Sequence, residues 1–533
     1  MVTPAESNIS YEPMKQSENS PPSTPETESR NLRDLLERRT ASRPLKPFLF
    51  SEADGRSFTY AEFDGAVNRA ARMLASKGVA KGDVVSLLMP NSAEYIIAYF
   101  ACFKLGALAG PVNSLLKSQE MAYVISNSEA KALLVHTDFR PRVDEILDEL
   151  PSLKHVIEFD DEARATAEFA DESRPLPSVE IGRDDEAIII YTSGTTGKPK
   201  GCLLTHGNLI ANARQISSWL NFTERDRLLT VMPLFHMNAV SVTTMTPLYA
   251  GGSTVVSPRF SASRFWKIVS DYEISSFGSV ATMLSMLLET YPDGVPEGLK
   301  TSQLRFAMCG SAPVPAEVMK RFEERFHCLV IEGYGLSEST CRSTFNPPDE
   351  RRRPGSCGLP IGNEMKVVDD EDKEVPDGSL GEIVLRGENI LKGYYKNPEA
   401  TAKAFRNGWL HTGDVGYRDS EGFFYIVDRK TDMIIRGGEN IYPREIDEVL
   451  YQHPAIAAAA TIGIPDRLYG EEVAAFVILK EGADATEDEI ISFCRERLAD
   501  YKCPKTVRFV KDIPKGPTGK LLKRELARQY QNS

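Results

Sequence analysis

The stretch YTSGTTGKPKG, residues 191–201, is the feature on which the interpretation of this chain depends. It holds three glycines, four Ser or Thr hydroxyls and two lysines, and it directly follows the apolar run AIII at 187–190. Backbone N–H groups of a glycine-rich turn can surround a phosphate, while lysines and hydroxyls supply charge and hydrogen bonds. The stretch is therefore either a phosphate-binding loop or a polar turn, and taken alone a solvated turn is the more common of the two.

The glycine spacing separates this loop from the Walker phosphate loop. The Walker pattern has four residues between its glycines before Gly-Lys, whereas Gly194 and Gly197 are separated by only two residues. The next residues, GCLL at 201–204, predict a strand, so we expect no helix to begin directly behind the loop. Other residues must decide between the two interpretations.

Composition limits the class of partner. The chain has 63 Lys and Arg against 76 Asp and Glu, a formal charge of -13, which argues against nucleic acid or an anionic membrane as partner. Its eight cysteines are scattered without metal-ligand spacing, which disfavours structural zinc and favours a reducing compartment. No run of about 18 apolar residues predicts a membrane-spanning helix. We therefore expect a cytoplasmic protein without an integral membrane segment.

The alternation of helical and strand-like apolar segments predicts an α/β protein, and a change in this pattern predicts two domains. Residues 1–30 are rich in Ser, Pro, Glu and Asn and predict a disordered tail rather than a secretory signal. Residues 31–430 alternate between helical and strand-like apolar segments, as layered α/β subdomains do, and become β-rich after about residue 355. Residues 431–533 show an α+β pattern, so we expect a small mobile C-terminal domain with a hinge near Thr431.

Six further motifs occur with the loop in a fixed order. They are PLFHMNA at 233–239, CGSAP at 309–313, EGYGLSES at 332–339, WLHTGD at 409–414, VDRKTDMIIRGGENIYP at 427–443 and PKGPTGKLLK at 514–523. With the loop, they resemble the adenylate-forming superfamily of acyl-CoA synthetases, luciferase and peptide synthetase adenylation domains. The local runs are most similar to crotonobetaine/carnitine-CoA ligases and medium-chain acyl-CoA synthetases.

The resemblance implies an ATP-dependent carboxylic acid:CoA ligase. In such enzymes a carboxylate attacks the α-phosphate of ATP, pyrophosphate leaves, and the thiol of coenzyme A then displaces AMP from the acyl adenylate. A carboxylate is already a nucleophile at neutral pH, so catalysis requires positioning and neutralisation of phosphate charge. The implied ligands are ATP, Mg²⁺, coenzyme A and a small carboxylic acid.

Roles for individual residues follow from the same resemblance. Glu338 is implied as the Mg²⁺ ligand, Lys520 as the catalytic lysine that bridges the carboxylate and the reacting phosphate, and His236 as a neighbour of the carboxylate pocket. Asp414 would accept hydrogen bonds from the ribose hydroxyls, with Arg429 assisting. The residues implied in binding the phosphates, adenine or the pantetheine arm are Thr192, Ser193, Gly194, Thr195, Thr196, Gly197, Lys198, Lys200, Gly310, Ser311, Ala312, Gly333, Tyr334, Gly335, Ser337, Gly437 and Gly438.

The acid itself is not specified by these motifs. Besides His236, Gly310 and Gly335, the family positions of the acid pocket are occupied here by Met237, Asn238, Val242, Val280, Met308, Cys341 and Arg342. This mixed set is neither an aliphatic tunnel nor an aromatic slot. We expect Arg342 to face solvent, as arginines usually do, with a clamp for a second acidic group as the alternative.

Two other functions remain to be separated from acid:CoA ligation. A stand-alone ligase that passes the acyl adenylate to an amine would share the first half-reaction and the same site. A catalytically inactive nucleotide sensor would be expected to lack Lys520 or Glu338, and both are present. Association into a homodimer is compatible with either enzyme.

Overall fold

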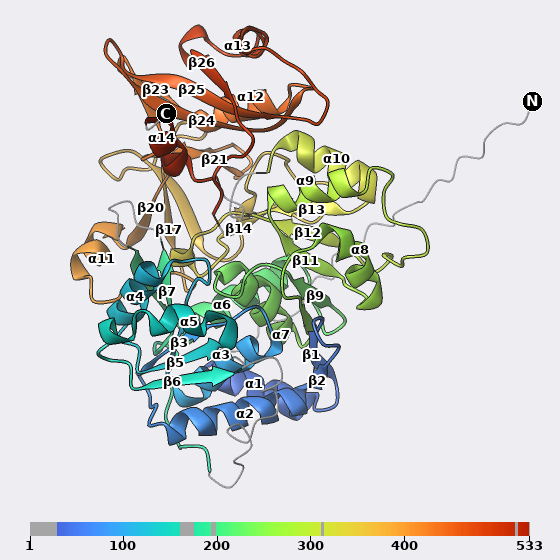
Figure 1. Cartoon of the computed structure of the whole chain (residues 1–533), viewed down its shortest axis with the longest axis vertical. Coiled ribbons are helices and arrows are strands. Elements are labelled where there is room, and N and C mark those ends of the chain that lie inside the picture. The colour runs from blue at the N-terminus through green and yellow to red at the C-terminus, as the bar shows by residue number, and fades with distance from the viewer. Residues whose placement is uncertain (1–28, 160–174, 193–198, 311–313, 517–520, 532–533) are drawn as a thin grey trace, which may run out of the picture.

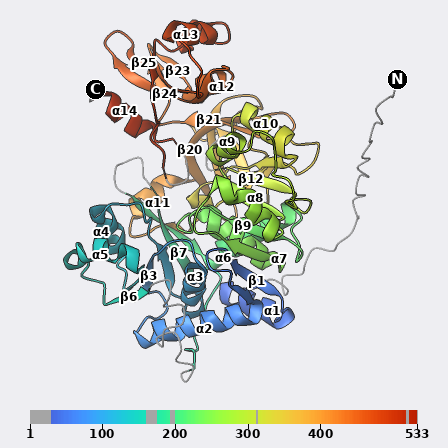
Figure 2. The same ribbon diagram turned by 45° about the vertical axis from the view of Figure 1, so that its right-hand side comes forward.

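The structure is a computed structural model of the 533-residue chain, and it describes residues 29–159, 175–192, 199–310, 314–516 and 521–531. The tail predicted for residues 1–30 lies almost entirely outside the described residues. Figure 1 shows a large body that contains the first four fifths of the chain and a small C-terminal unit at one end. Figure 2 shows the same separation from a second direction.

The first sheet of the large body holds the two ends of the phosphate-loop candidate. In the described part of the chain it is seven-stranded, in the order β18-β8-β7-β4-β3-β5-β6. The pairs from β7 through β4, β3 and β5 to β6 are parallel, whereas β8 pairs antiparallel with both β7 and β18. The strands are β3 Val84–Leu88, β4 Leu108–Pro111, β5 Ala132–His136, β6 His155–Phe159, β7 Glu186–Thr192, β8 Lys200–Thr205 and β18 Gly393–Tyr394.

The second sheet supplies the strand ends at which the CGSAP and EGYGLSES motifs begin. Its described strands run in the order β13-β12-β11-β9-β10-β1-β2, and all pairs except β1 with β2 are parallel. Ligand-binding residues of parallel sheets gather beyond the carboxyl ends of the strands. The strands are β1 Pro47–Ser51, β2 Ser57–Thr59, β9 Arg227–Thr230, β10 Ser253–Val256, β11 Ser276–Ser279, β12 Phe306–Cys309 and β13 Leu329–Glu332.

Helices cover both sheets, and their ends follow from local capping. The side chain of Ser92 caps the start of α3, Ala93–Leu105, and Gly106 ends it in the left-handed conformation at φ 67°. Thr205 and Asn208 form a capping box at the start of α6, His206–Trp219. The remaining helices of the two layers are α1 Leu32–Ser42, α2 Tyr60–Ser76, α4 Ser118–Asn127, α5 Arg140–Asp144, α7 Thr246–Ala250, α8 Ala262–Asp271, α9 Ala281–Thr290 and α10 Ala316–Phe326.

The predicted β-rich subdomain closes the large body. Its main sheet runs β16-β17-β20-β19, with β21 paired to β20, and a short pair β14–β15 lies beside it. The alternation of Gly, Asp and Pro with short apolar runs is typical of such strands and turns. The elements are β14 Thr344–Phe345, β15 Leu359–Pro360, β16 Glu364–Val368, β17 Gly381–Arg386, α11 Pro398–Ala404, β19 Phe405–Arg406, β20 Trp409–Arg418 and β21 Phe424–Arg429.

The small C-terminal unit has its own sheet, in the order β23-β22-β25-β24 with β26 paired to β25. Its helix α12 contacts the large body, because the backbone N–H of Arg444 donates to Asp428 Oδ2 at 3.1 Å. The change of sheet falls between β21 and β22, next to Thr431. The elements are β22 Ile434–Arg436, β23 Glu439–Ile441, α12 Pro443–Tyr451, β24 Ile456–Asp466, β25 Gly470–Leu479, α13 Glu487–Arg495, β26 Thr506–Phe509 and α14 Lys523–Gln531.

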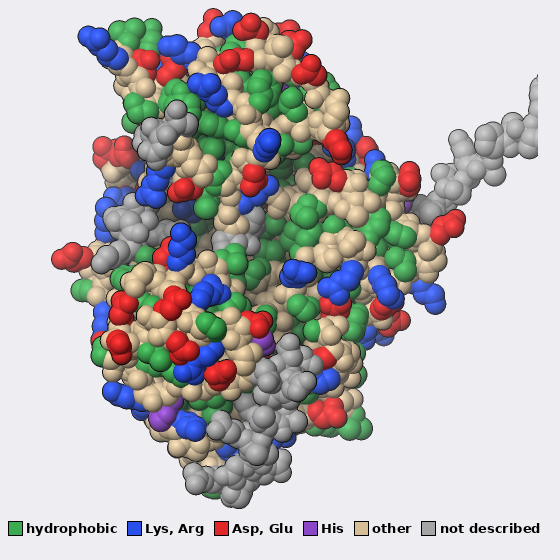
Figure 3. All heavy atoms as spheres, in the orientation of Figure 1, with side chains coloured by type: hydrophobic (Ala, Val, Ile, Leu, Met, Phe, Trp, Pro, Cys, Tyr) green, Lys and Arg blue, Asp and Glu red, His purple; other side chains and the backbone are tan. Residues whose placement is uncertain are grey.

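The predicted fold class, a large layered α/β domain with a β-rich subdomain and a small α+β domain, is confirmed. The domain limits at 30 and 430 stay predictions. All eight cysteines are buried and free, and within the described ranges no helix has the length and apolar character needed to cross a membrane. On the face seen in Figure 3, Lys and Arg side chains are interspersed with Asp and Glu rather than gathered into one surface.

Candidate active site

The two ends of the YTSGTTGKPKG stretch are held together by an antiparallel hairpin. Thr192, the last residue of β7, pairs with Lys200, the first residue of β8. The strand predicted after the loop is confirmed, so no helix begins directly behind it. Ser193, Gly194, Thr195, Thr196, Gly197 and Lys198 lie outside the described residues.

Glu338 is held beside this hairpin by a tyrosine that the sequence analysis missed. Glu338 lies in a short 3₁₀ helix, Ser337–Ser339, and the hydroxyl of Tyr394 donates to its Oε1 at 3.0 Å. The ammonium group of Lys200 lies 5.2 Å from the centre of the same tyrosine ring. Tyr394 on β18 therefore links the phosphate-loop lysine to the carboxylate predicted to bind Mg²⁺, and no motif in the sequence marks it.

Asp414 lies between a tyrosine and an arginine. It is 3% exposed, its Oδ2 accepts from the hydroxyl of Tyr334 at 2.6 Å, and its Oδ1 lies 3.0 Å from Nε of Arg429. Asp414 and Arg429 are paired across β20 and β21. Each carboxylate oxygen has a second lone pair, so Asp414 can still accept two hydrogen bonds from neighbouring hydroxyls, as the predicted ribose contact requires.

The negative charge of Asp414 changes the pKa values of its two neighbours, Arg429 and Tyr334. Burial acts to lower the pKa of Arg429, but the negative charges of Asp414 and its neighbours outweigh burial and raise it. Burial, together with the charge of Asp414, raises the pKa of Tyr334 well above its usual value, so the hydroxyl remains a donor. Asp414 thus has a fixed neighbour at each of its two carboxylate oxygens.

The glycines predicted near adenine are positions that a side chain cannot occupy. A Cβ on Gly333 would lie 2.5 Å from the ring of Phe345, and one on Gly335 would lie 1.9 Å from the carbonyl oxygen of Cys341. A Cβ on Gly310 would lie 2.6 Å from Nη1 of Arg342. The ring and backbone contacts explain glycine at 333 and 335, whereas the atom that approaches Gly310 is the end of the Arg342 side chain. Ser311 and Ala312 lie outside the described residues.

His236 immediately precedes an unusual helix. Residues Asn238–Met245 form a π-helix, a feature frequent at functional sites. Burial lowers the pKa of His236 to about 4, so the ring is neutral at neutral pH, and its Nε2 has no hydrogen-bond partner. Both polar atoms of the Asn238 amide are also buried and unpaired. A substrate that reaches this region would find donors and acceptors that are not yet satisfied.

The expectation that Arg342 faces solvent is wrong, because the side chain is only 1% exposed. Its guanidinium lies over the ring of Phe345, 5.4 Å from the ring centre. Burial of this charge depends on contacts among β12, α6 and residues 333–345, which are distant from one another in the sequence. The burial of Arg342 favours the alternative, in which the guanidinium binds a second acidic group of the substrate.

The glycine pair of the small domain lies in an exposed turn. Gly437 and Gly438 form the turn between β22 and β23, have φ values of 60° and 93°, and are exposed. The N–H of Gly437 donates to the carbonyl of Tyr469, within the same domain. Lys520 lies outside the described residues, so its predicted role stays a prediction.

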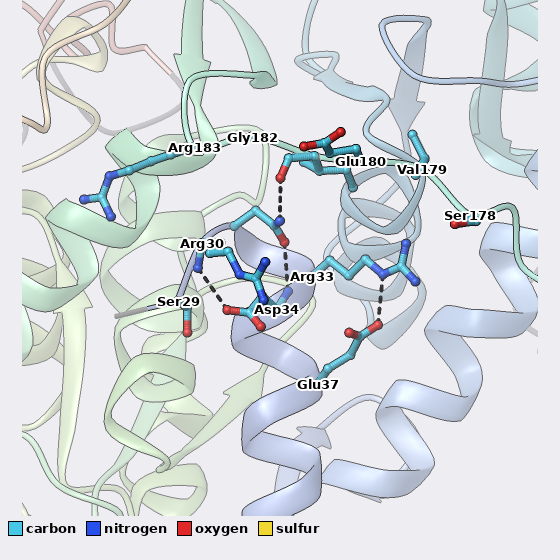
Figure 4. A pocket seen from close by; sticks show the side chains of 12 residues that line it. Ser29, Arg30, Arg33, Asp34, Glu37, Ser178, Val179, Glu180, Gly182 and Arg183 are labelled. Atoms are coloured by element: carbon cyan, nitrogen blue, oxygen red, sulfur yellow. Dashed lines mark hydrogen bonds and ion pairs between the residues drawn. The ribbon is translucent and has the colours of Figure 1, made fainter. Parts of the chain in front are cut away.

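A separate surface hollow lies beside α1 and residues 178–183 (Figure 4). Its polar side chains already have partners, because Arg33 pairs with Glu37 at 3.0 Å and the amide of Asn31 donates to the carbonyl of Ile181 at 2.8 Å. None of the predicted site residues lines it. We assign it no ligand.

Comparison with known proteins finds similarity over nearly the whole chain. The family description "AMP-binding enzyme" matches residues 36–395, and "AMP-binding enzyme C-terminal domain" matches residues 445–520. The sulfoacetate–CoA ligase of Cupriavidus necator is 37% identical over 503 residues, which cover 93% of this chain and 97% of that protein. Long-chain-fatty-acid–CoA ligase FadD13 of Mycobacterium tuberculosis is 37% identical over 500 residues, with coverage of 93% and 97%. ATP-bound MatB from Rhodopseudomonas palustris superposes with a TM-score of 0.88 at 31% identity and covers 94% of this chain and 99% of its own.

Replacement of Tyr394 by Phe tests how Glu338 is held. Without the hydroxyl, Glu338 can turn away from the phosphate loop, and loss of such a supporting contact typically weakens metal binding by about tenfold or more. We expect the Mg²⁺ concentration that gives half of the ATP-dependent thermal stabilisation to rise by about tenfold. Tyr395→Phe, at the neighbouring position, is the matched control. Equal Mg²⁺ dependence of Tyr394→Phe and the wild type would contradict this role.

Proposed function

The chain belongs to the family of AMP-binding enzymes and is an AMP-forming acid:CoA ligase, and we propose that the residues described above carry out its two half-reactions. The observation that carries this proposal is the Asp414 carboxylate, which is held between Arg429 and Tyr334, the residue that lies between Gly333 and Gly335 in the chain. Such a carboxylate suits a ribose, and the neighbouring glycines suit a flat base.

In the first half-reaction the acid and ATP are joined. A carboxylate oxygen of the acid bonds to the α-phosphorus, the bond to the bridging oxygen breaks, and pyrophosphate leaves with that electron pair. Mg²⁺, when bound, neutralises phosphate charge. Glu338 fits this ion because Oε1 keeps a lone pair beyond the one that accepts from Tyr394, and a hard carboxylate oxygen is a preferred ligand. In the described residues no cluster of three ligating side chains exists, so phosphate oxygens would complete the shell.

Lysines hold the phosphates in this scheme rather than act as bases. Lys200 is fixed at the base of the loop by its pairing with Thr192. Lys198 would add a second positive charge for the phosphates. Lys520 is proposed to approach from the small domain and bridge the carboxylate and the α-phosphate. The neutral His236 would line the carboxylate side of the pocket.

The second half-reaction requires a different set of residues in the same cleft. The thiol sulfur bonds to the acyl carbon, and AMP leaves with the carboxylate oxygen. Gly437 and Gly438 are exposed, and we propose that the small domain rotates to bring them to the pantetheine arm. Thr431 is exposed between two anchors, since Lys430 N–H donates to Gly413 and Asp432 N–H donates to Arg429. These contacts support Thr431 as the pivot.

A second candidate function is transfer of the acyl group to an amine, which would use the same first half-reaction. Coenzyme A is favoured because the relatives reported above are CoA ligases over nearly their whole length. Their acids differ, from sulfoacetate to long-chain fatty acids, so relatedness alone does not choose the acid. We further propose a cytoplasmic location, on the basis of the eight scattered and free cysteines, and a homodimer.

Measurement of pyrophosphate release across a panel of acids tests the proposed function. We expect release to require both ATP and an acid, and AMP and an acyl thioester to accumulate only when coenzyme A is added. Lys520→Ala should slow pyrophosphate release by about 100-fold, as loss of a charge stabilising the transition state does, while thioester formation from supplied acyl adenylate is slowed far less. Pyrophosphate release at the same rate with and without an acid would contradict the proposal. Formation of an amide from an added amine, with no thioester from coenzyme A, would favour the second candidate.

Replacement of Thr431 by Pro tests the pivot. Proline fixes φ near -65° and removes a backbone N–H, so we expect thioester formation to fall by about tenfold or more while the adenylation rate changes little. Thr431→Ala is the control that leaves the backbone free to rotate. Rapid-quench measurement of the two half-reactions separates the rates, and an equal loss in both would eliminate the pivot.

A further inference from the structure

Arg342 places a positive charge in the interior of the large domain without a counter-charge. Its Nε and Nη2 are buried and have no hydrogen-bond partner, and no carboxylate of the described residues pairs with it. A buried charge is strongly unfavourable unless it is paired and hydrogen-bonded. A chain that keeps arginine here therefore provides a site for an anion that is not part of the protein.

The backbone of Arg342 is fixed, so the guanidinium has a defined position. Asn212 on α6 accepts from its N–H at 3.3 Å and donates to its carbonyl at 2.7 Å. Asn389 donates to the same carbonyl at 3.3 Å, and Ser241 of the π-helix donates to Asn212 Oδ1 at 2.9 Å. Pre-organisation of this kind lowers the cost of binding, because the receptor does not need to become ordered.

Glu332 is a carboxyl group whose pKa is affected by the charge of Arg342, but it forms no ion pair with the guanidinium and does not serve as its counter-ion. Its Oε1 accepts from the N–H of Val314 at 3.2 Å, and burial raises its pKa to about 7. The positive charge that acts most strongly on it is that of Arg444, and Arg342 contributes less. Its Oε2 is itself buried without a hydrogen-bond partner, and with a pKa of about 7 the carboxyl group is only partly ionised at neutral pH and offsets the charge of Arg342 incompletely.

The guanidinium of Arg342 lies at the proposed junction between nucleotide and acid. It lies directly against Gly310, the first residue of the segment implied in nucleotide binding. On the adjacent strand, the unpaired amide of Asn238 lies over Gly278, where a Cβ would come within 2.7 Å of its Oδ1. Gly278 pairs with Met308, so Gly278 and Gly310 are about 8 Å apart by strand geometry. The unpaired guanidinium of Arg342 and the unpaired amide of Asn238, which lie against these two glycines, suit a short polar molecule rather than a long alkyl chain.

We propose that Arg342 determines specificity by binding a second anionic group on the acid substrate, which makes the substrates short acids that carry an additional carboxylate or sulfonate. This inference rests on the proposed ligase function and names its substrate class. A planar guanidinium binds carboxylate and sulfonate oxygens through two parallel N–H groups. The substrate's reacting carboxylate would point toward the α-phosphate, and its second anion would supply the missing partner of Arg342.

The test compares acids of equal skeleton that differ in the second charge. Pyrophosphate release is measured for succinate, 3-sulfopropionate and butyrate, which lacks the second anionic group, with malonate and adipate as shorter and longer dicarboxylates. We expect kcat/KM for at least one dianionic acid to exceed that for butyrate by about 100-fold, the usual penalty for leaving a buried charge unpaired. The succinate and sulfopropionate arms show which anion is preferred, and a preference for adipate over both shorter acids would contradict the stated size.

Arg342→Met should reduce this selectivity ratio by about 100-fold, and Arg342→Lys should restore part of it. Arg353→Met is the matched control, because Arg353 also lies over a phenylalanine ring, 5.5 Å from the centre of Phe423, but is paired with Glu421 at the surface. A general folding defect in the Arg342 variants lowers the rates for both acids and leaves their ratio unchanged, so the ratio reports specificity alone.

Three outcomes would overturn the inference. The first is a wild-type preference for butyrate or longer monocarboxylic acids, which leaves the proposed ligase function intact. The second is an unchanged ratio in Arg342→Met. The third is an equal rise in the KM for ATP with every acid in that variant, which would assign the guanidinium to the nucleotide. Absence of pyrophosphate release with every acid would instead contradict the ligase function itself and the inference with it.

Discussion

The contact on which the nucleotide site depends is the one between Asp414 and its two neighbours. Tyr334 comes from the segment after β13 and Arg429 from the end of β21, so a single carboxylate joins the second parallel sheet to the β-rich subdomain. Arg429, the partner of Asp414 in this contact, is also only two residues before Thr431, where the small domain begins. A change in this contact would therefore alter both the orientation of the ribose and the point from which the small domain departs.

Polar groups that lack partners mark the other half of the site. His236 Nε2, both atoms of the Asn238 amide and two nitrogens of Arg342 are buried without hydrogen bonds. Folded proteins rarely leave such groups unsatisfied, and these gather where β11 and β12 end and the π-helix begins. Their free energy of burial is recovered only when a ligand arrives, which is a physical reason for the enzyme to discriminate among acids by polar contacts. The nucleotide half, in contrast, is already internally paired.

Features that depend on local sequence were predictable. The turn glycines, the strand after the loop and the alternation of helices and strands follow from short-range rules, and the pairing of Asp414 with Arg429 agrees with their implied joint role. The burial of Arg342 was mispredicted because it results from packing against Gly310 and Phe345, and solvent exposure is only the average behaviour of arginine. Tyr394 was missed because its contact with Glu338 joins residues 56 positions apart. Such contacts depend on tertiary structure and leave no local pattern.

The central claim is that a substrate carboxylate attacks the α-phosphate and later leaves with AMP. It is tested most directly by supplying an acid labelled with ¹⁸O in its carboxylate and analysing the products by mass spectrometry after a single turnover with coenzyme A. The account predicts one ¹⁸O atom in AMP and none in pyrophosphate. Label in inorganic phosphate together with ADP, or AMP without label, would contradict it.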